Sequence, residues 1–293
     1  MILITGCAGK TGRNVLQALV EREEPVRALV YQPEQIDLVE SIGAQDVVVG
    51  DMNSAEAMRE AVQGIRAIYH IPPNVSPYEI SIGQTMIAAA KEAGVQHFVY
   101  HSVLKPQSEA MPHHWRKLRV EELLLESRML YTIMQPAVYM QNLLVHWKKI
   151  LQEGIYAVPY PTATRLSFVD LRDVAQAAAI VLTGEGHEFA QYELVGTEGI
   201  SQSEVASILG KELGRPVQAV SIPIDTWRRQ AKESGLGEEQ IETLTKMFAF
   251  YQQYDFIGNP RVLGWLLEYP PTTLNKFIRQ VHKEMDSPHQ VPV

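Results

Sequence analysis

Residues 2–12 read ILITGCAGKTG, and this stretch decides the fold. The apolar run at residues 2–5 is typical of a buried parallel strand, and the periodic apolar residues at 13–20 predict a helix. Gly6, Gly9 and Gly12 stand between the two, so the chain can turn tightly and its backbone can approach a phosphate closely. The helix then directs its free N–H groups at that phosphate. We therefore predict that this turn binds the pyrophosphate of a dinucleotide.

A P-loop is excluded by spacing. Gly9-Lys10-Thr11 resembles the end of that motif, but a P-loop needs a glycine five positions before the Gly-Lys pair. Position 4 is Ile4, inside the predicted strand. The alternative to a dinucleotide site is an ordinary tight turn, which the position at the start of a βαβ unit disfavours.

Strand and helix patterns alternate through the first two thirds of the chain. Predicted strands occupy residues 2–5, 26–31, 46–49, 67–71, 96–100, 131–135 and 191–195. Predicted helices occupy residues 13–20, 55–62, 80–93 and 115–127. This alternation predicts an α/β fold, a Rossmann-type doubly wound parallel sheet with the strand order 3-2-1-4-5-6.

The last third changes character and becomes mostly helical. Helices are predicted over residues 201–213, 226–234, 238–254 and 273–285, the first of them opened by a capping box of Ser201 and Glu204. We predict a Rossmann domain from residues 1–153 and 167–196, and a smaller, mostly helical, substrate-side lobe from residues 154–166 and 197–285. The polar tail at 286–293, with two prolines, is expected to be flexible.

Composition and charge narrow the function classes. The chain has 293 residues, a net charge of −8 and one cysteine. Direct binding of nucleic acid is not expected, because the charge provides no basic surface. A single cysteine excludes an intramolecular disulfide and a Cys-based zinc site, and the histidines lack ligand spacing, so we expect no metal. With no signal peptide and no apolar run of about 18 residues, we expect a cytoplasmic protein that does not enter a membrane.

The end of the second predicted strand normally decides between NAD and NADP. An Asp or Glu there binds the ribose hydroxyls of NAD, whereas a nearby Arg accepts the 2′-phosphate of NADP. Tyr31 and Gln32 stand there and do neither. Lys10 and Arg13 favour NADP(H) over NAD(H), unless both are solvated surface charges. Asp51, after the third strand, either binds the adenine amino group or begins a helix.

Several short motifs along the chain form a specific combination. They are the glycine turn at 5–12, VRALV at 26–30, Gly50-Asp51, VYHSV at 99–103, Lys117 with Val120-Glu121-Glu122, YTIMQP at 131–136 and YMQN at 139–142. In this combination the chain resembles the NmrA-like proteins, an atypical branch of the short-chain dehydrogenase/reductase superfamily. The resemblance extends over nearly the whole chain and implies an NAD(P)-binding Rossmann fold.

The resemblance implies a cofactor site assembled from separate segments. The pyrophosphate would lie on the glycine turn, the adenine between Asp51 and Met52, the nicotinamide ribose on Lys117 and the nicotinamide along residues 136–139. Many relatives have the arginine for the 2′-phosphate where this chain has Tyr31, which argues against NADP. The implied cofactor residues are Gly6, Cys7, Ala8, Gly9, Lys10, Thr11, Gly12, Tyr31, Asp51, Met52, Ile71, Pro72, Pro73, Lys117, Pro136, Ala137, Val138 and Tyr139.

The catalytic position departs from the family pattern. Typical reductases of the superfamily place a proton-donating tyrosine four residues before the lysine, on the same helical face. Here that position is His113. His113 is either the proton donor, because imidazole titrates near neutral pH, or a partly exposed residue at a helix start without a catalytic role. Lys117 is either the second catalytic residue, as the ribose ligand, or a solvated helix lysine.

Two functions fit these residues. The first is an NAD(P)H-dependent reductase without the usual tyrosine, which passes hydride to a small acceptor such as a quinone or another carbonyl compound. Proximity in a dry cleft would then provide most of the catalysis. The second is a non-catalytic redox sensor that binds NAD(P)(H) and acts through a regulatory protein partner. The C-terminal lobe favours the enzyme, because such a lobe usually closes a substrate pocket. The oligomeric state stays open.

Overall fold

The computed structural model describes residues 1–286 and contains two compact units. The first comprises residues 1–109, 113–136 and 171–193, and the second comprises residues 110–112, 137–170 and 194 onward. The sequence-based division placed four segments with the first unit that the structure groups with the second, namely residues 110–112, 137–153, 167–170 and 194–196. Of the tail predicted at 286–293, Asp286 ends a helix and the remainder lies outside the described residues.

A seven-stranded sheet organises the first unit, in the order β11-β6-β5-β4-β1-β2-β3. All pairs among the strands β1 to β6 are parallel. The predicted order 3-2-1-4-5-6 and the Rossmann-type fold are thereby confirmed. The strands are β1 (Ile2–Ile4), β2 (Val26–Val30), β3 (Asp46–Val49), β4 (Ala67–His70), β5 (His97–His101), β6 (Tyr131–Pro136) and β11 (Ala190–Leu194).

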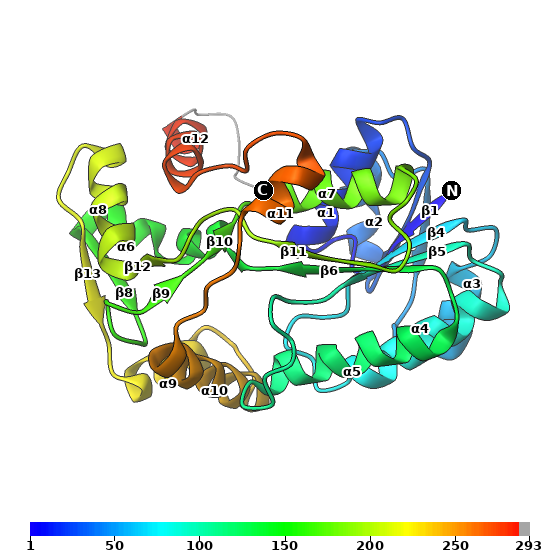
Figure 1. The fold of residues 1–293 in the computed structure, drawn as a ribbon, viewed down its shortest axis with the longest axis horizontal. Coiled ribbons are helices and arrows are strands. Elements are labelled where there is room, and N and C mark those ends of the chain that lie inside the picture. The colour runs from blue at the N-terminus through cyan, green and yellow to red at the C-terminus, as the bar shows by residue number, and fades with distance from the viewer. Residues whose placement is uncertain (287–293) are drawn as a thin grey trace. The chain divides into compact units, whose positions relative to one another are not determined.

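Helices cover both faces of this sheet (Figure 1). In that view α3, α4 and α5 lie below the strands, and α1 and α7 lie above them. The doubly covered strands are consequently apolar, and every residue of β1 is fully buried. The helices are α1 (Lys10–Val20), α2 (Ile36–Ile42), α3 (Ala55–Ala61), α4 (Glu79–Glu92), α5 (Pro112–Ser127) and α7 (Leu171–Thr183), with a 3₁₀ turn, η1, at Pro33–Gln35.

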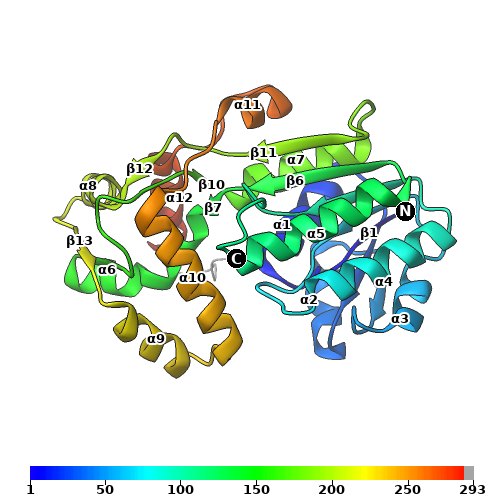
Figure 2. The same ribbon diagram turned by 60° about the horizontal axis from the view of Figure 1, so that its bottom comes forward.

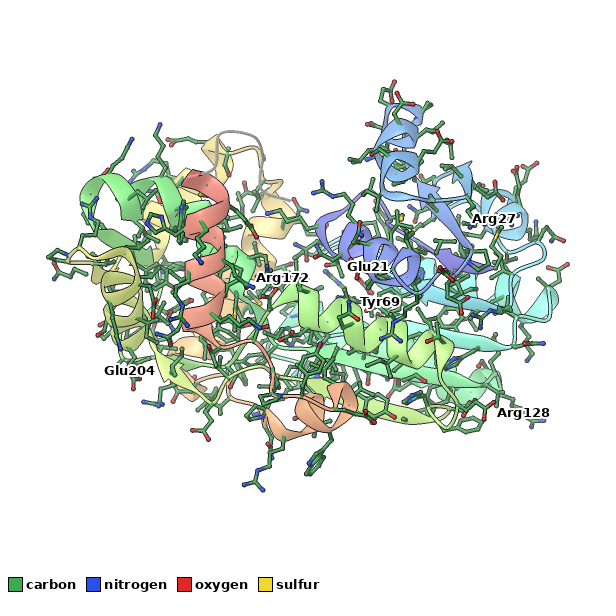
Figure 3. The ribbon with its side chains drawn as sticks, turned by 90° about the horizontal axis from the view of Figure 1, so that it is seen from above. Glu21, Arg27, Tyr69, Arg128, Arg172 and Glu204 are labelled. Carbon is green, nitrogen blue, oxygen red and sulfur yellow. The ribbon has the colours of Figure 1, made fainter. Side chains whose placement is uncertain are left out.

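Strand register decides which side chains reach each face. His70 of β4 pairs with Tyr100 of β5, and Tyr69 pairs with Val99. Paired residues point to the same face, so His70 and Tyr100 share one face, the one whose apolar core includes Leu3 and Val120 of α5. Tyr69 points to the other face, and Figure 3 shows it beside α1 and α7. The ends of β4 and β5 therefore supply polar side chains to both faces of the sheet.

The second unit consists mainly of helices with three small two-stranded pieces, which confirms the predicted helical character. The β7–β10 and β8–β13 pairs are parallel, and β9–β12 is antiparallel. Helices α9 and α10 pack side by side (Figure 2). The elements are β7 (Val138–Tyr139), η2 (Met140–His146), α6 (Trp147–Glu153), β8 (Ile155–Val158), β9 (Arg165–Leu166), β10 (Phe168–Val169), β12 (Ile200–Ser201), α8 (Gln202–Leu213), β13 (Gln218–Ser221), α9 (Ile224–Glu233), α10 (Glu238–Tyr254), α11 (Arg261–Leu267) and α12 (Leu274–Asp286).

Local signals set several helix ends. The predicted capping box opens α8, because Ser201 Oγ accepts the N–H of Glu204 at 3.2 Å and Glu204 Oε2 accepts the N–H of Ser201 at 2.7 Å. Helix α1 begins at Lys10, earlier than predicted. Helix α2 was not predicted, and Val39 is its one buried residue, so this helix has no extended apolar face against the core. Among residues 1–286, no helix combines the length and the hydropathy needed to cross a bilayer.

Candidate functional site

The glycine turn fits closely against the end of β4. Gly6 has a φ of +59°, which favours glycine, and a Cβ there would lie 2.9 Å from the carbonyl oxygen of Ile71. A Cβ on Gly12 would lie 2.6 Å from the Cα of Cys7, because α1 passes directly over the turn. The N–H of Gly9 donates to the carbonyl of Gly6 at 3.0 Å and closes the turn. Glycine is therefore required at Gly6 and Gly12.

The start of α1 has the properties of an anion site. Gly9 is its N-cap and provides no side-chain hydrogen bond, and the first turn carries no acidic residue. The first N–H groups of a helix have no acceptor within the helix, and the helix dipole adds a partial positive charge there. Because the turn before it also lacks side-chain bulk, this part of the chain fits a dinucleotide pyrophosphate.

Cys7, inside the turn, has a structural role. Its side chain is fully buried, and burial raises the pKa of the thiol to about 12. The thiol therefore stays protonated and unreactive at neutral pH.

The end of β2 carries an exposed tyrosine. The side chain of Tyr31 is 65% exposed, and no carboxylate stands beside it in sequence. The backbone N–H groups of Tyr31 and Gln32 both donate to Gln35 Oε1, at 3.0 and 3.1 Å. The two residues that directly follow β2 thus provide no carboxylate of the kind that would select NAD.

Asp51 opens the turn that leads into α3. Its Oδ1 accepts the backbone N–H of Asn53 at 2.8 Å, and Ser54 then caps the helix. This arrangement matches the interpretation of Asp51 as a residue that begins a helix, while an adenine contact stays a prediction. The methyl carbon of Met52 would lie 3.7 Å from a Cβ on Gly6, so Met52 and the glycine turn are brought together.

Lys117 is buried in an ion pair. Lys117 belongs to α5, and only 5% of the residue is exposed to solvent. The alternative of a solvated helix lysine is therefore wrong. Lys117 Nζ donates to Glu79 Oε1 at 3.0 Å and to the carbonyl oxygen of His101 at 2.9 Å, and it lies 5.1 Å from the ring centre of Tyr100. The hydroxyl of Tyr100 donates to the same Glu79 oxygen at 2.6 Å.

Glu79 is the site residue that the sequence interpretation missed. It stands in the first turn of α4, where an acidic residue usually does no more than complement the helix dipole. Its side chain is nevertheless fully buried, and its partner Lys117 is 38 residues away in sequence. Local pattern contains no signal for such a pairing. The helix predicted from residue 80 in fact begins at Glu79.

His113 is also buried, so the alternative that described it as a partly exposed residue is wrong about its exposure. The residue is 8% exposed and meets His114 edge-on, with ring centres 5.8 Å apart. Burial lowers the pKa of His113 well below its usual value, and the positive charge of Lys117 lowers it further. His113 is therefore a neutral imidazole at neutral pH, and its Nδ1 has no hydrogen-bond partner within the described residues.

Three more neutral histidines surround the lysine. Burial, followed by the charge of Lys117, lowers the pKa values of His70 and His101 to about 3. Burial also lowers the pKa of His114 to about 4. His70 Nδ1 hydrogen bonds with Thr5 Oγ1 at 3.1 Å, and His101 Nδ1 with the Tyr69 hydroxyl at 2.7 Å. In the described part of the chain no group of three or more His, Cys, Asp or Glu residues could hold a metal ion.

The lowered pKa values of these histidines lead us to expect that the folded chain becomes less stable in acid. Their folded pKa values lie below the ordinary value of 6.5, so between pH 6.5 and about 4 the unfolded chain binds more protons than the folded one. The stability that these neutral histidines contribute is complete above pH 6.5. As the pH is lowered below 6.5, the free energy of unfolding decreases by up to about 1.4 kcal/mol per pH unit for each histidine. Urea unfolding at pH 7.5, 6 and 5, repeated in high salt to screen surface charges, measures it. Equal stability at all three pH values would contradict the prediction.

The structure brings most predicted site residues into one unit. The glycine turn, Tyr31, Asp51, Met52, residues 71–73, His113, Lys117 and Pro136 all belong to the first unit. Ala137, Val138 and Tyr139 belong to the second, where β7 pairs with β10. The boundary between the two units thus falls directly after Pro136, which ends β6.

The chain is similar to known proteins over most of its length. The model of the NmrA-like family matches residues 1–285. An NAD(P)H azoreductase of Xenophilus azovorans is 30% identical over 251 residues, covering 85% of this chain and 86% of that protein. Quinone oxidoreductase 2 of Escherichia coli is 25% identical over 278 residues, covering 94% of this chain and 96% of that protein.

Solved structures share the fold. The NADPH complex of an NADPH-dependent quinone oxidoreductase from Escherichia coli has a TM-score of 0.85 and 24% identity, covering 96% of this chain and 100% of that one. A triphenylmethane reductase from Citrobacter sp., complexed with NADP(H), has a TM-score of 0.83 and 23% identity, covering 95% of this chain and 99% of that one. At these levels of identity, both similarities show that the fold is shared.

Proposed function

We propose that this chain, which belongs to the NmrA-like family, is an NAD(P)H-dependent oxidoreductase that reduces quinone-like acceptors. The observation that carries the proposal is the close fit of Gly6 and Gly12 around an uncapped helix start, which leaves space and N–H donors for a pyrophosphate. The names of two relatives, an azoreductase and a quinone oxidoreductase, support a conjugated acceptor.

Lys117 is the residue we propose for the nicotinamide ribose. An ammonium group has three N–H donors, and two of them are used by Glu79 and the carbonyl of His101. The third donor is left for a ribose hydroxyl. When bound, the cofactor supplies the hydride from its nicotinamide ring, and the chain's part is to hold that ring in place and exclude water.

The protonation state of His113 bears on the acceptor. A neutral imidazole is a much weaker acid than an imidazolium, so His113 as described does not supply the proton that a tyrosine supplies in typical relatives. A quinone needs little acid assistance, because its reduced product is a stabilised phenolate that takes a proton from water. A simple aldehyde would give an unstabilised alkoxide. We therefore propose quinones over simple carbonyl compounds.

NADP(H) is the cofactor we propose over NAD(H). Arg13, in the first turn of α1, has a buried Nε without a hydrogen-bond partner among the described residues, and a 2′-phosphate would provide one. Lys10 adds a second cation close to the turn, and neither Tyr31 nor Gln32 at the end of β2 repels a phosphate.

Binding and turnover test the function directly. We expect NADPH to bind more tightly than NADH in a fluorescence titration, and the absorbance of NADPH to fall when quinones are added but not when simple aldehydes are. Failure to bind either cofactor would contradict the whole proposal. Tight binding with no turnover across a quinone panel would contradict the enzyme and favour a redox sensor that acts through a protein partner.

A further inference from the structure

The carboxylate of Glu79 is bonded on one side only. Its Oε1 accepts hydrogen bonds from Lys117 Nζ at 3.0 Å and from the Tyr100 hydroxyl at 2.6 Å. Its Oε2 is buried and has no hydrogen-bond partner in the described part of the chain. An unpaired buried carboxylate oxygen is costly, so a residue placed purely for stability would be expected to bond through both oxygens. Glu79 is instead bonded through the oxygen that holds the lysine.

Other charged groups near Lys117 do not take the place of Glu79. Glu121 follows Lys117 by one turn of α5, but its Oε1 accepts from Ser102 Oγ and from Gln135 Nε2, the latter at 2.9 Å. The surrounding histidines of β4, β5 and α5 are neutral, because burial lowers their pKa values. A neutral imidazole neither balances the ammonium nor competes with it for the carboxylate. Glu79 thus holds the countercharge.

A buried ion pair is a poor device for stability. Desolvation of two charges commonly offsets their attraction, and apolar side chains of similar volume often stabilise a core as well or better. A buried ammonium is better explained if its remaining N–H binds a ligand, and such binding depends on where the ammonium is held. Glu79 and the His101 carbonyl fix that position, because they take two of the three donors.

We propose that Glu79 is the positioning residue of Lys117: it holds the ammonium so that one N–H is presented to the nicotinamide ribose. The inference rests on the proposed function, which assigns that ribose to Lys117. In this role Glu79 acts through Lys117 and not through a contact of its own with the cofactor or the acceptor. Its effect should therefore be felt by the nicotinamide half of the cofactor and not by the adenine half.

Two ligands separate these halves. NADPH contains the nicotinamide ribose, whereas adenosine 2′,5′-bisphosphate contains only the adenine end. We expect Glu79→Gln, which keeps the shape but removes the charge, to weaken NADPH binding about 10- to 100-fold, the size of one lost hydrogen bond from a charged donor. Binding of adenosine 2′,5′-bisphosphate should change less than about twofold. Fluorescence and calorimetric titrations measure both affinities.

Glu121→Gln is the matched control, because it makes the same substitution at another buried carboxylate that does not hold Lys117. We expect less than about threefold change in NADPH affinity there, since its hydrogen bonds lie elsewhere. If Glu79→Gln leaves NADPH affinity unchanged, or weakens both ligands equally, or if Glu121→Gln causes the same loss, the inference is overturned. Should Glu79→Gln not fold, Glu79→Asp retracts the carboxylate and must show the same selective loss.

Lys117→Met distinguishes this inference from the proposed function. If Lys117→Met weakens NADPH binding and Glu79→Gln does not, the positioning role alone fails. If Lys117→Met binds NADPH normally, the ribose assignment fails and the inference fails with it. In a double-mutant cycle, Glu79→Gln should cause no further loss in the Lys117→Met background, because both changes act through one contact.

Discussion

Gly12→Ala is expected to destroy the dinucleotide site. The added Cβ would lie 2.6 Å from the Cα of Cys7 and 2.8 Å from its carbonyl oxygen, and both are backbone atoms that cannot rotate away. Helix α1 must then move off the turn, at a cost of about 1–3 kcal/mol for overpacking. Its N–H groups move with it. Misplacement of groups by roughly 1 Å can lower a reaction rate about 100-fold, and we expect a loss of similar size in NADPH affinity here, because the N–H donors no longer face the pyrophosphate.

Fluorescence titration of NADPH, together with thermal unfolding, measures the effect. Gly264→Ala in α11 is the matched control, because its Cβ would lie 3.5 Å from Pro271 Cδ and 3.8 Å from the carbonyl oxygen of Tyr269, which are ordinary contact distances. Alanine is favoured over glycine within a helix, so this control should fold at least as stably and bind NADPH normally. NADPH affinity within threefold of the unmodified chain in Gly12→Ala would contradict the assignment of the turn.

The glycine turn was predictable because its signal is local. Gly6, Gly9 and Gly12 fall between two elements whose periods differ, and the alternation of those periods along the chain predicts the doubly wound parallel sheet. The place of Tyr31 was equally predictable, since its position at the end of β2 follows from the strand pattern alone. In each case, neighbours in sequence carry the information.

The interior of the site was not predictable in the same way. Sequence placed Lys117 four residues after His113, but it did not show that both are buried or that Glu79 pairs with the lysine. Those facts arise when the start of α4 and the middle of α5 come together beside the end of β5. Burial then changes the chemistry, since it makes His113 a neutral imidazole and removes the simplest version of the proton-donor hypothesis.

The same burial makes charge balance a condition for folding. Lys117 and Glu79 are 7% and 0% exposed at their side chains, so neither can be solvated if its partner is removed. A surface pair such as Lys246 and Glu242, 51% and 54% exposed, has no such constraint. Removing one charge should therefore have very different effects at the two places.

Lys117→Met is accordingly expected to lower the free energy of unfolding by about 3–5 kcal/mol, because it leaves the Glu79 carboxylate buried without a countercharge. Adding Glu79→Gln to the same chain removes that charge and should restore most of the loss. Lys246→Met, the matched control at the surface pair, should change stability by less than about 1 kcal/mol. Urea unfolding at pH 7.5 measures all three variants. A Lys117→Met chain as stable as Lys246→Met, or a double variant no more stable than Lys117→Met, would show that this buried pair does not control folding.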